Sequence, residues 1–536
     1  MAKGTTRQIR TRPARKPREP LLTQIASFVD LFVWLLVLKS FFLPLFIIPT
    51  GSMAETLMGA HATYTCPNCG YEFPVGFHTA AGPTVVQCPN CRFQQPTRRE
   101  MPGGVTLRKK AGDRIVVHGW PYDVGGRLAP QRWDVVVFKN PNQPDVNYIK
   151  RLIGLPGETI EIIDGDVFVK KPGEDELRPA VKTRWAQRAL WMPYYNHDYR
   201  PRREAQDWIG RPLTAANGPR QPRWPPYLPR WVALAPRDGW QDLEQRVVRF
   251  DGVALSRRTI QFATQPGDDP PPGRILDIYG YNSDVVLDYH DVTDVRLSAD
   301  VALLDGDGYV ELVISKHDDY FFGRLAADGT LTLMHARGAD GPRETWGTAR
   351  IDDPAAGHRL ALGHADYHVT LEVDGRVVLE SDPARYRVTA EQARSYARLA
   401  QPPTIRIAAG QVVATLAHLL IERDVYYTSG NLRDRLRTPG GLPGNGTQGN
   451  PITLRPDAYF VCGDNSPASH DSRAWSAADL GPHLRRDFEQ GRYDVGTVPA
   501  DQMIGRAFFV YWPGFLPLSE RGPTLLPDMG RIRWIH

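Results

Sequence analysis

The longest apolar stretch of the chain lies near its beginning, from residue 21 to residue 49. It contains the runs LFVWLLVL and FFLPLFIIP, and only Asp30 and Lys39 interrupt it with a charge. This length suits a helix that spans a bilayer when the two charges lie near its ends, and the basic segment 1–20 would then stay in the cytoplasm. A cleaved secretory signal is the alternative, but the stretch is too long and no small-residue cleavage site follows it. The pattern therefore predicts a single transmembrane anchor over 21–49.

Short runs of β-branched residues, separated by glycine and proline, follow between residues 111 and 169. The runs are DRIVVH, WDVVVFKNP and YIKRLIGLPGETIEIIDGDVFV. This pattern predicts a small, coiled antiparallel β domain. Lys150 lies in one of these runs, next to Ile149 and close to Leu152, so apolar neighbours can bury its side chain and lower its pKa.

A long middle stretch interrupts this pattern. Its first part, 171–274, is rich in Trp, Pro and Arg, and we expect irregular structure there. Alternating apolar positions return in 275–430, where HVTLEVDGRVVLES predicts a hairpin with Asp374 and Gly375 at its turn. We therefore expect an inserted β-sandwich of jelly-roll type, which suits either a glycan- or protein-binding module or a module without ligand chemistry. Strand-like sequence then resumes in 452–536.

Composition and charge narrow the function only slightly. The 536 residues are enough for several domains, and the composition is that of a globular protein. The formal net charge of +5 is small for this length, and basic residues of segment 1–20 contribute to it. No nucleic-acid partner is expected from so weak a charge.

Four of the five cysteines form two CPNC units. Two C-x2-C knuckles about 18 residues apart can place four thiolates around a zinc ion. We therefore expect a zinc-ribbon-like insert over 62–98, with a structural metal, because a closed four-sulfur site leaves no open position for chemistry. Disulfides are the alternative, since an extracytoplasmic compartment permits them. The four residues are Cys66, Cys69, Cys88 and Cys91.

Six motifs occur in one order behind the apolar stretch: IPTGSMAETL, GDRIVV, WDVVVFKNP, YIKRLIGLPGE, GDNSPASHDSR and IGRAFFVYWP. This set resembles bacterial type I signal peptidases, also called leader peptidases. The resemblance covers 21–57, 111–169 and 454–513, whereas the cysteine units and the middle stretch lie outside it. It implies a membrane-bound serine endopeptidase that removes signal peptides from exported preproteins at the outer face of the plasma membrane. It also implies small substrate side chains at the first and third positions before the cut, and no cofactor for catalysis.

The resemblance assigns roles residue by residue. Ser52 matches the nucleophile and Lys150 matches its general base. Thr50 matches a hydroxyl that stabilises the oxyanion together with the backbone N–H of Ser52. The other matches are residues that orient the lysine or hold the last motif in shape: Ser469 for the first role, and Arg151, Asp464, Asp471 and Arg473 for the second.

The expected chemistry is consistent with elementary acid-base behaviour. A serine hydroxyl attacks an amide when a nearby base accepts its proton, and a lysine can be that base when desolvation lowers its pKa from about 10.4. Directly after the anchor, Ser52 would lie at the lipid surface, where the cleavage region of a signal peptide emerges. The predicted organisation is a basic tail (1–20), an anchor (21–49), a first peptidase part (50–170) with the ribbon (62–98), an irregular insertion (171–274), a sandwich (275–430) and a second peptidase part (452–536).

Three other interpretations stay open. The first is a serine protease that uses His470 and Asp471 with Ser52, although adjacent side chains on a strand face opposite ways. The second is a soluble, self-cleaving protease with the same serine and lysine, against which the anchor argues. The third is a membrane-tethered binding protein in which the sandwich is functional and the peptidase site is vestigial.

Overall fold

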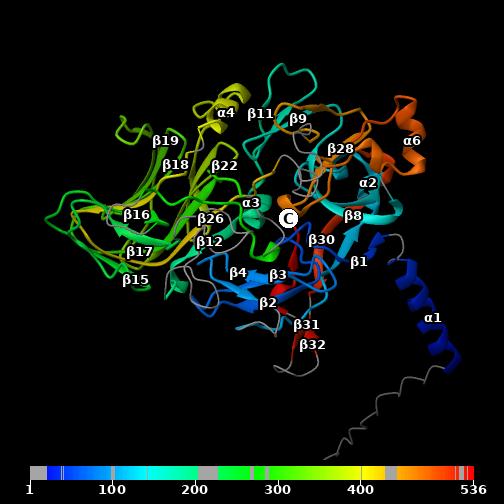
Figure 1. Ribbon diagram of the computed structural model, residues 1–536, viewed down its shortest axis with the longest axis horizontal. Coiled ribbons are helices and arrows are strands. Elements are labelled where there is room, and N and C mark those ends of the chain that lie inside the picture. Colours follow the sequence, from blue (N-terminus) through cyan, green and yellow to red (C-terminus); the bar gives the residue numbers. More distant parts are fainter. Residues whose placement is uncertain are drawn as a thin grey trace, which may run out of the picture.

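The computed structural model describes residues 21–37, 39, 42–97, 103–141, 143–202, 227–265, 271–283, 289–399, 401–428, 444–513, 515–517, 524–527 and 529–536. The predicted basic tail 1–20 lies outside these residues. Strands make up most of the regular structure, so the expected mainly β fold is confirmed. Figure 1 shows two β-rich bodies side by side, with the short strands β2 to β4, whose connections carry the four knuckle cysteines, below their junction.

The first body is an antiparallel sheet built from segments on both sides of the middle insertion. β7 pairs with β8 so that Val136 lies opposite Lys150, and β28 pairs with β8 so that Cys462 lies opposite Arg151. The two halves of the sequence therefore meet on β8, the strand that carries Lys150. The strand order is β1 (Leu45–Ile47), β6 (Arg114–His118), β30 (Met503–Trp512), β7 (Val135–Asn140), β8 (Gln143–Gly154), β28 (Ala458–Cys462) and β29 (Val498–Pro499), and β33 (Arg533–Trp534) pairs with β30.

Smaller elements complete this body. A four-stranded sheet follows the order β11 (Arg178–Pro179), β10 (Asp166–Lys170), β9 (Thr159–Ile163) and β27 (Ile452–Thr453). β31 (Phe515–Pro517) and β32 (Thr524–Pro527) form a separate hairpin. Among the described residues, the helices beyond the first are short. They are α2 (Trp120–Val124) and α6 (Pro482–Glu489) in the peptidase segments, and α3 (Arg184–Leu190) and α4 (Ala390–Ala397) in the middle insertion.

The second body is a sandwich of two antiparallel sheets, drawn mostly in green and yellow in Figure 1. Leucines from both sheets meet in one core, and a Cβ added at Gly323 would come within 2.7 Å of Leu371 in the opposite sheet. One sheet contains β14 (Trp240–Gln241), β15 (Val247–Asp251), β26 (Val413–Arg423), β17 (Val295–Asp305), β22 (His358–Ala365), β23 (His368–Val373) and β24 (Arg376–Glu380), with β12 (Met192–Asn196) on β26. The other contains β13 (Arg230–Ala233), β16 (Arg258–Ala263), β25 (Ile405–Gly410), β18 (Tyr309–Lys316), β19 (Asp319–Ala326), β20 (Thr330–Arg337) and β21 (Glu344–Arg350).

The predicted hairpin in this sandwich is confirmed. β23 and β24 pair antiparallel, and the two residues that connect them, Asp374 and Gly375, both have positive φ, at 50° and 75°. Positive φ at both central positions is the condition for the type I′ turn that matches the twist of paired strands. The Asp-Gly pair therefore sets this connection.

The stretch 171–274 differs from the irregular structure that we expected. It contributes β12 to β16, all of which join the sandwich sheets, so the sandwich begins well before residue 275. These strands are short, and the Trp, Pro and Arg residues around them obscure the alternation of apolar and polar positions. Strand pairing with partners far along the chain, such as β15 with β26, stabilises them instead.

A buried lysine joins the two bodies. Lys316 Nζ, on β18, donates to Asp166 on β10 over 2.6 Å and to Asp294 over 2.5 Å. Asp166, Asp294 and Asp366 lie close enough together to hold a cation, and Lys316 supplies the positive charge there. A buried charge is tolerated only when it is paired in this way.

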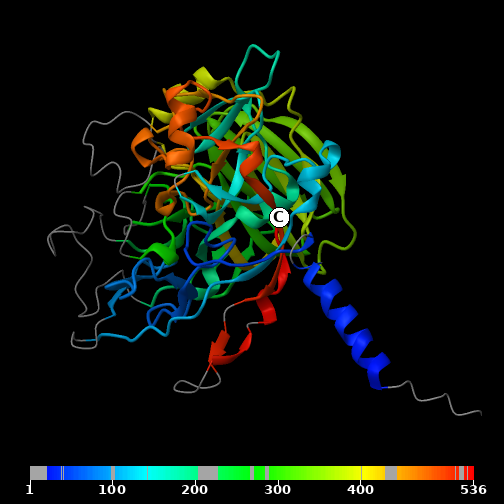
Figure 2. The ribbon, with the colours of Figure 1, turned by 90° about the vertical axis from the view of Figure 1, so that its right-hand side faces the viewer.

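Helix α1 (Leu21–Val37) covers part of the predicted anchor and stands apart from the rest of the molecule (Figure 2). Its apolar side chains are exposed, including Phe28 at 73% and Trp34 at 72%. Across the described residues, no helix is both long enough and apolar enough to cross a membrane.

Candidate active site

The nucleophile predicted for this chain contacts the predicted base. Ser52 lies in the loop between β1 and β2 (His61–Thr65), and Lys150 lies on β8. The Lys150 amine donates to Ser52 Oγ over 2.6 Å and to the carbonyl oxygen of Ile149 over 3.1 Å. Only 4% of Lys150 is exposed.

The surroundings of Lys150 favour its neutral form. Burial lowers the pKa of Lys150 to about 8, although the carboxylates of Asp471 and Asp464 act in the opposite direction. Desolvation penalises an ammonium that has too few partners to replace water. A fraction of this lysine is therefore unprotonated near neutral pH and can accept a proton from Ser52 at hydrogen-bond distance.

Buried apolar side chains and backbone hydrogen bonds hold the Ser52 loop in its conformation. Met53 and Leu57 are fully buried in a core that also holds Ile115 and Val117 of β6. The N–H of Leu57 donates to the carbonyl of Met53 over 2.8 Å. Ser52 itself is only half-buried, so its hydroxyl stands at the edge of this core. Thr50, the predicted oxyanion residue, is exposed two positions earlier.

One residue that holds this loop was missed in the sequence. Asn465 donates from its side chain to the carbonyl of Gly51 over 2.9 Å, and from its backbone to the carbonyl of Ser52 over 3.1 Å. In the sequence, Gly463-Asp464-Asn465 is a polar turn that follows an apolar strand, and nothing there indicates that its asparagine contacts the Ser52 loop.

The motif GDNSPASHDSR takes part in a buried network of ion pairs, one of which involves Arg151, the residue after Lys150. Arg151 donates to Asp464 through two hydrogen bonds of 2.7 Å, and both side chains are fully buried. Arg473 pairs with Asp471 over 2.7 Å, and Asp471 also accepts from the N–H of Gly463 over 2.8 Å. These contacts are consistent with the prediction that the four residues hold the motif in its conformation, because bidentate ion pairs fix the relative orientation of their side chains.

Two details of this network bear on the predicted roles. Burial acts to raise the pKa of Asp471, but the Arg473 guanidinium and the hydrogen bonds outweigh it, so the pKa is lowered and the group stays ionised. The Ser469 hydroxyl donates to Asp471 over 2.6 Å. Ser469 is thus tied to the carboxylate, and its expected role in orienting Lys150 remains a prediction.

The four knuckle cysteines lie together in the ribbon. β2 pairs with β3 (Glu72–Gly76), and β4 (Val85–Gln87) pairs with β5 (Gln94–Pro96). Each CPNC unit lies in the connection between the two strands of one hairpin. Each cysteine is free, and their sulfur atoms all lie within 4.8 Å of one another. The 3.6 Å separations of the Cys66–Cys91 and Cys69–Cys88 sulfur pairs match the spacing of about 3.8 Å that a tetrahedral Zn–S bond length of about 2.3 Å requires. The donor set therefore fits zinc.

Comparison with known proteins agrees with the motifs. The family model described as "Signal peptidase, peptidase S26" matches residues 97–205 and 421–512. Signal peptidase I of Pseudomonas aeruginosa is 29% identical over 155 residues, which cover 27% of this chain and 36% of that protein. Signal peptidase I of Rickettsia akari is 55% identical over 40 residues, which cover 8% of this chain and 15% of that protein. The resemblance to type I signal peptidases is thereby confirmed, although the chain spans only about a third or less of the length of these relatives.

Solved structures match this chain only weakly. A carbohydrate-binding module from Bacillus subtilis is 11% identical and covers 36% of this chain and 94% of its own, with a TM-score of 0.23. A β-glucanase from Bacillus licheniformis is 7% identical and covers 40% of this chain and 96% of its own, with a TM-score of 0.24. Likeness at this level assigns no ligand to the sandwich.

Proposed function

We propose that this chain is a membrane-anchored serine endopeptidase that removes signal peptides from exported preproteins, with Ser52 as nucleophile and Lys150 as general base. The observation that carries the proposal is the 2.6 Å contact between the buried Lys150 amine and Ser52 Oγ. The family match supports a peptidase of this class. The proposed location is the plasma membrane, with the site on the extracytoplasmic side.

The proposed reaction has two halves. Neutral Lys150 accepts the proton of Ser52 Oγ as that oxygen attacks the scissile carbonyl carbon, and the resulting ammonium gives a proton to the leaving amine. The backbone N–H of Ser52 and the hydroxyl of Thr50 would stabilise the oxyanion, at about 3 kcal/mol per donor. Lys150 then accepts a proton from the water that hydrolyses the acyl-enzyme.

The proposed substrate delivery depends on the segment that precedes Ser52. The exposed apolar side chains of α1 support a lipid contact, since exposed apolar surface of this extent marks a membrane or protein interface. Ser52 follows that segment within a short distance along the chain, which would hold the nucleophile near the lipid surface. Signal peptides with small side chains at the first and third positions before the cut are the proposed substrates, and no nucleic-acid partner is proposed.

The proposed metal is a structural zinc in the ribbon. Cys66, Cys69, Cys88 and Cys91 would hold it as thiolates, and the metal would stabilise a segment that has few strands of its own. No catalytic step uses it.

Cleavage of a preprotein tests the proposed function. The purified full chain in detergent is incubated with a preprotein that carries alanine at both specificity positions, and the product's amino terminus is sequenced. Wild type is expected to cut once, after the second alanine, and Ser52→Ala to give no product. Ser256→Ala, which changes an exposed serine of the sandwich, is the matched control and should cut like wild type. Equal cleavage by Ser52→Ala would remove the proposed nucleophile.

A further inference from the structure

A short segment of the middle insertion, Tyr279 to Asn282, contacts the Ser52 loop. Its last three residues form the single turn η4 (Gly280–Asn282), and all four residues are buried. This segment belongs to the part of the chain that lies outside the signal peptidase motifs, and it matches neither segment of the family model. Its contacts with the candidate active site are nevertheless direct.

Asn282 fixes the side chain that holds the Ser52 loop. The amides of Asn282 and Asn465 exchange two hydrogen bonds, of 2.7 Å and 2.8 Å, and both side chains are buried. The second N–H of the Asn465 amide is then directed to the carbonyl of Gly51. Because an amide carries donors on one end and an acceptor on the other, loss of Asn282 would let Asn465 rotate and leave Gly51 without its donor. Ser52 is the next residue.

Tyr279 and Tyr281 hold the same region from two sides. The Tyr279 hydroxyl donates to the carbonyl of Asp464 over 2.9 Å, and the Tyr281 hydroxyl donates to the carbonyl of Ala60 over 3.0 Å. The Tyr281 ring also packs directly on Gly51, where an added Cβ would come within 2.0 Å of it. One segment of the insertion thus contacts both the loop of Ser52 and the turn whose carboxylate pairs with Arg151.

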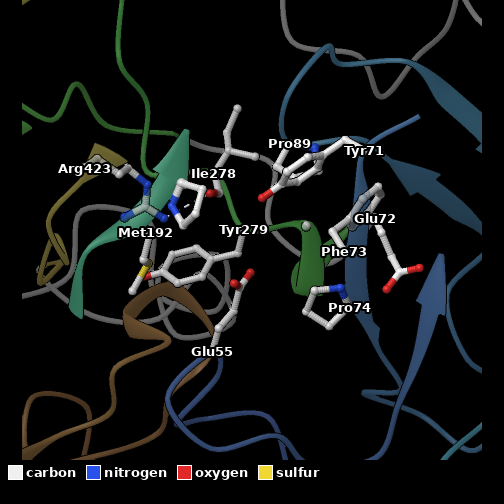
Figure 3. A pocket seen from close by; sticks show the side chains of 12 residues that line it. Glu55, Tyr71, Glu72, Phe73, Pro74, Pro89, Met192, Ile278, Tyr279 and Arg423 are labelled. Atoms are coloured by element: carbon white, nitrogen blue, oxygen red, sulfur yellow. Dashed lines mark hydrogen bonds between the residues drawn. The ribbon is translucent and has the colours of Figure 1, made fainter. Parts of the chain in front are cut away.

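The ribbon packs against this segment. Gly280 packs on Phe73 of β3 and on Pro89 of the second cysteine knuckle. Figure 3 shows the junction: Tyr279, the ribbon residues Phe73 and Pro89, and Glu55 of the Ser52 loop surround a cavity of about 120 Å³, with Arg423 of the sandwich on the far side. The Arg423 guanidinium lies 4.4 Å from the centre of the Tyr279 ring and donates to the carbonyl of Ile278 over 2.9 Å.

We propose that Tyr279, Tyr281 and Asn282 are positioning residues that hold the Ser52 loop in register with Lys150, and that the ribbon keeps them in place. The inference rests on the proposed function, because the reaction it serves is the one catalysed by Ser52. It makes the two additions to the peptidase, the ribbon and the insertion, parts of one support for the nucleophile. A displacement of the loop by a fraction of an ångström would lower the rate of attack without removing a catalytic group.

Preprotein cleavage by Asn282→Ala tests the proposal, with Asn196→Ala as the matched control. Asn196 also uses its side-chain oxygen in a local hydrogen bond, but it lies on β12 of the sandwich. Asn282→Ala is expected to lower kcat at least tenfold, with KM within about twofold and an unchanged midpoint of the pH–rate profile. Tyr281→Ala should act in the same direction, and Tyr281→Phe, which keeps the ring against Gly51, should recover most of the rate.

Hydrogen–deuterium exchange provides a measurement that does not depend on activity. Peptides that cover residues 50–60 should exchange faster in Asn282→Ala and in the ribbon variant Phe73→Ala than in wild type and Asn196→Ala. Unchanged exchange in those peptides, or a kcat for Asn282→Ala equal to that of the control, would overturn the positioning role. Failure of wild type to cleave any preprotein would instead remove the proposed function, and the exchange comparison would still decide whether the segment holds the loop.

Discussion

The protonation state of Lys150 should set the pH dependence of cleavage. Burial lowers the pKa of this group to about 8, and only the neutral amine can accept the proton of Ser52. For a pKa of about 8, the neutral fraction is about 1% at pH 6, about 9% at pH 7 and about 50% at pH 8. We therefore expect kcat/KM to rise about tenfold from pH 6 to 7, about 50-fold from pH 6 to 8, and to level off near pH 9.

An exposed lysine would give a different profile. With an ordinary pKa of about 10.4, the rise would continue to pH 10 and the neutral fraction at pH 7 would be smaller than 0.1%. The difference between the two cases at pH 7 exceeds 100-fold by the same calculation, so the plateau position reports directly on the burial of Lys150.

The assay is a series of kcat/KM measurements on one preprotein in detergent from pH 5.5 to 10. His470→Ala is the informative companion, because an imidazole base would move the midpoint toward pH 6.5. We expect wild type and His470→Ala to share a midpoint near 8. A midpoint near 10, or one near 6.5 that disappears in His470→Ala, would refute the reasoning.

Two further predictions concern stability. Metal analysis of the purified chain should find one zinc per molecule, and Cys69→Ser should lose it together with a lower melting temperature; an intact zinc content in that variant would exclude the four-cysteine site. Arg151→Ala leaves the Asp464 carboxylate buried without its partner, so the free energy of unfolding measured in urea should fall by about 3–5 kcal/mol. A loss below about 1 kcal/mol would mean that water or another cation replaces the guanidinium.

The pairing of Ser52 with Lys150 was expected from the resemblance to signal peptidases, and the structure brings the two side chains to hydrogen-bond distance. Lys150 lies within a run of β-branched residues. Ser52 follows an apolar stretch and belongs to the first of six motifs that occur in the family's order. Local patterns of this kind predict which residues occupy strands and loops. They also predicted the Asp374-Gly375 hairpin, because the turn chemistry is contained in two adjacent residues.

The support of the site could not be predicted in the same way. Asn282 and Asn465 are ordinary loop residues in the sequence, and their reciprocal hydrogen bonds arise only because the insertion folds back onto the peptidase sheet. Strands β12 to β16 were missed for a related reason: their partners lie far along the chain, so pairing and not local alternation stabilises them. Contacts between distant segments carry no local sequence signature.

Single-turnover cleavage of a preprotein by Lys150→Ala, beside His470→Ala, tests the central claim most directly. Lys150→Ala removes the only side chain that the structure brings to hydrogen-bond distance of Ser52 Oγ within the described residues, and it leaves the nucleophile in place. The account predicts no detectable product with Lys150→Ala and near-normal cleavage with His470→Ala. Cleavage by Lys150→Ala at the wild-type rate, with loss of cleavage in His470→Ala, would contradict it.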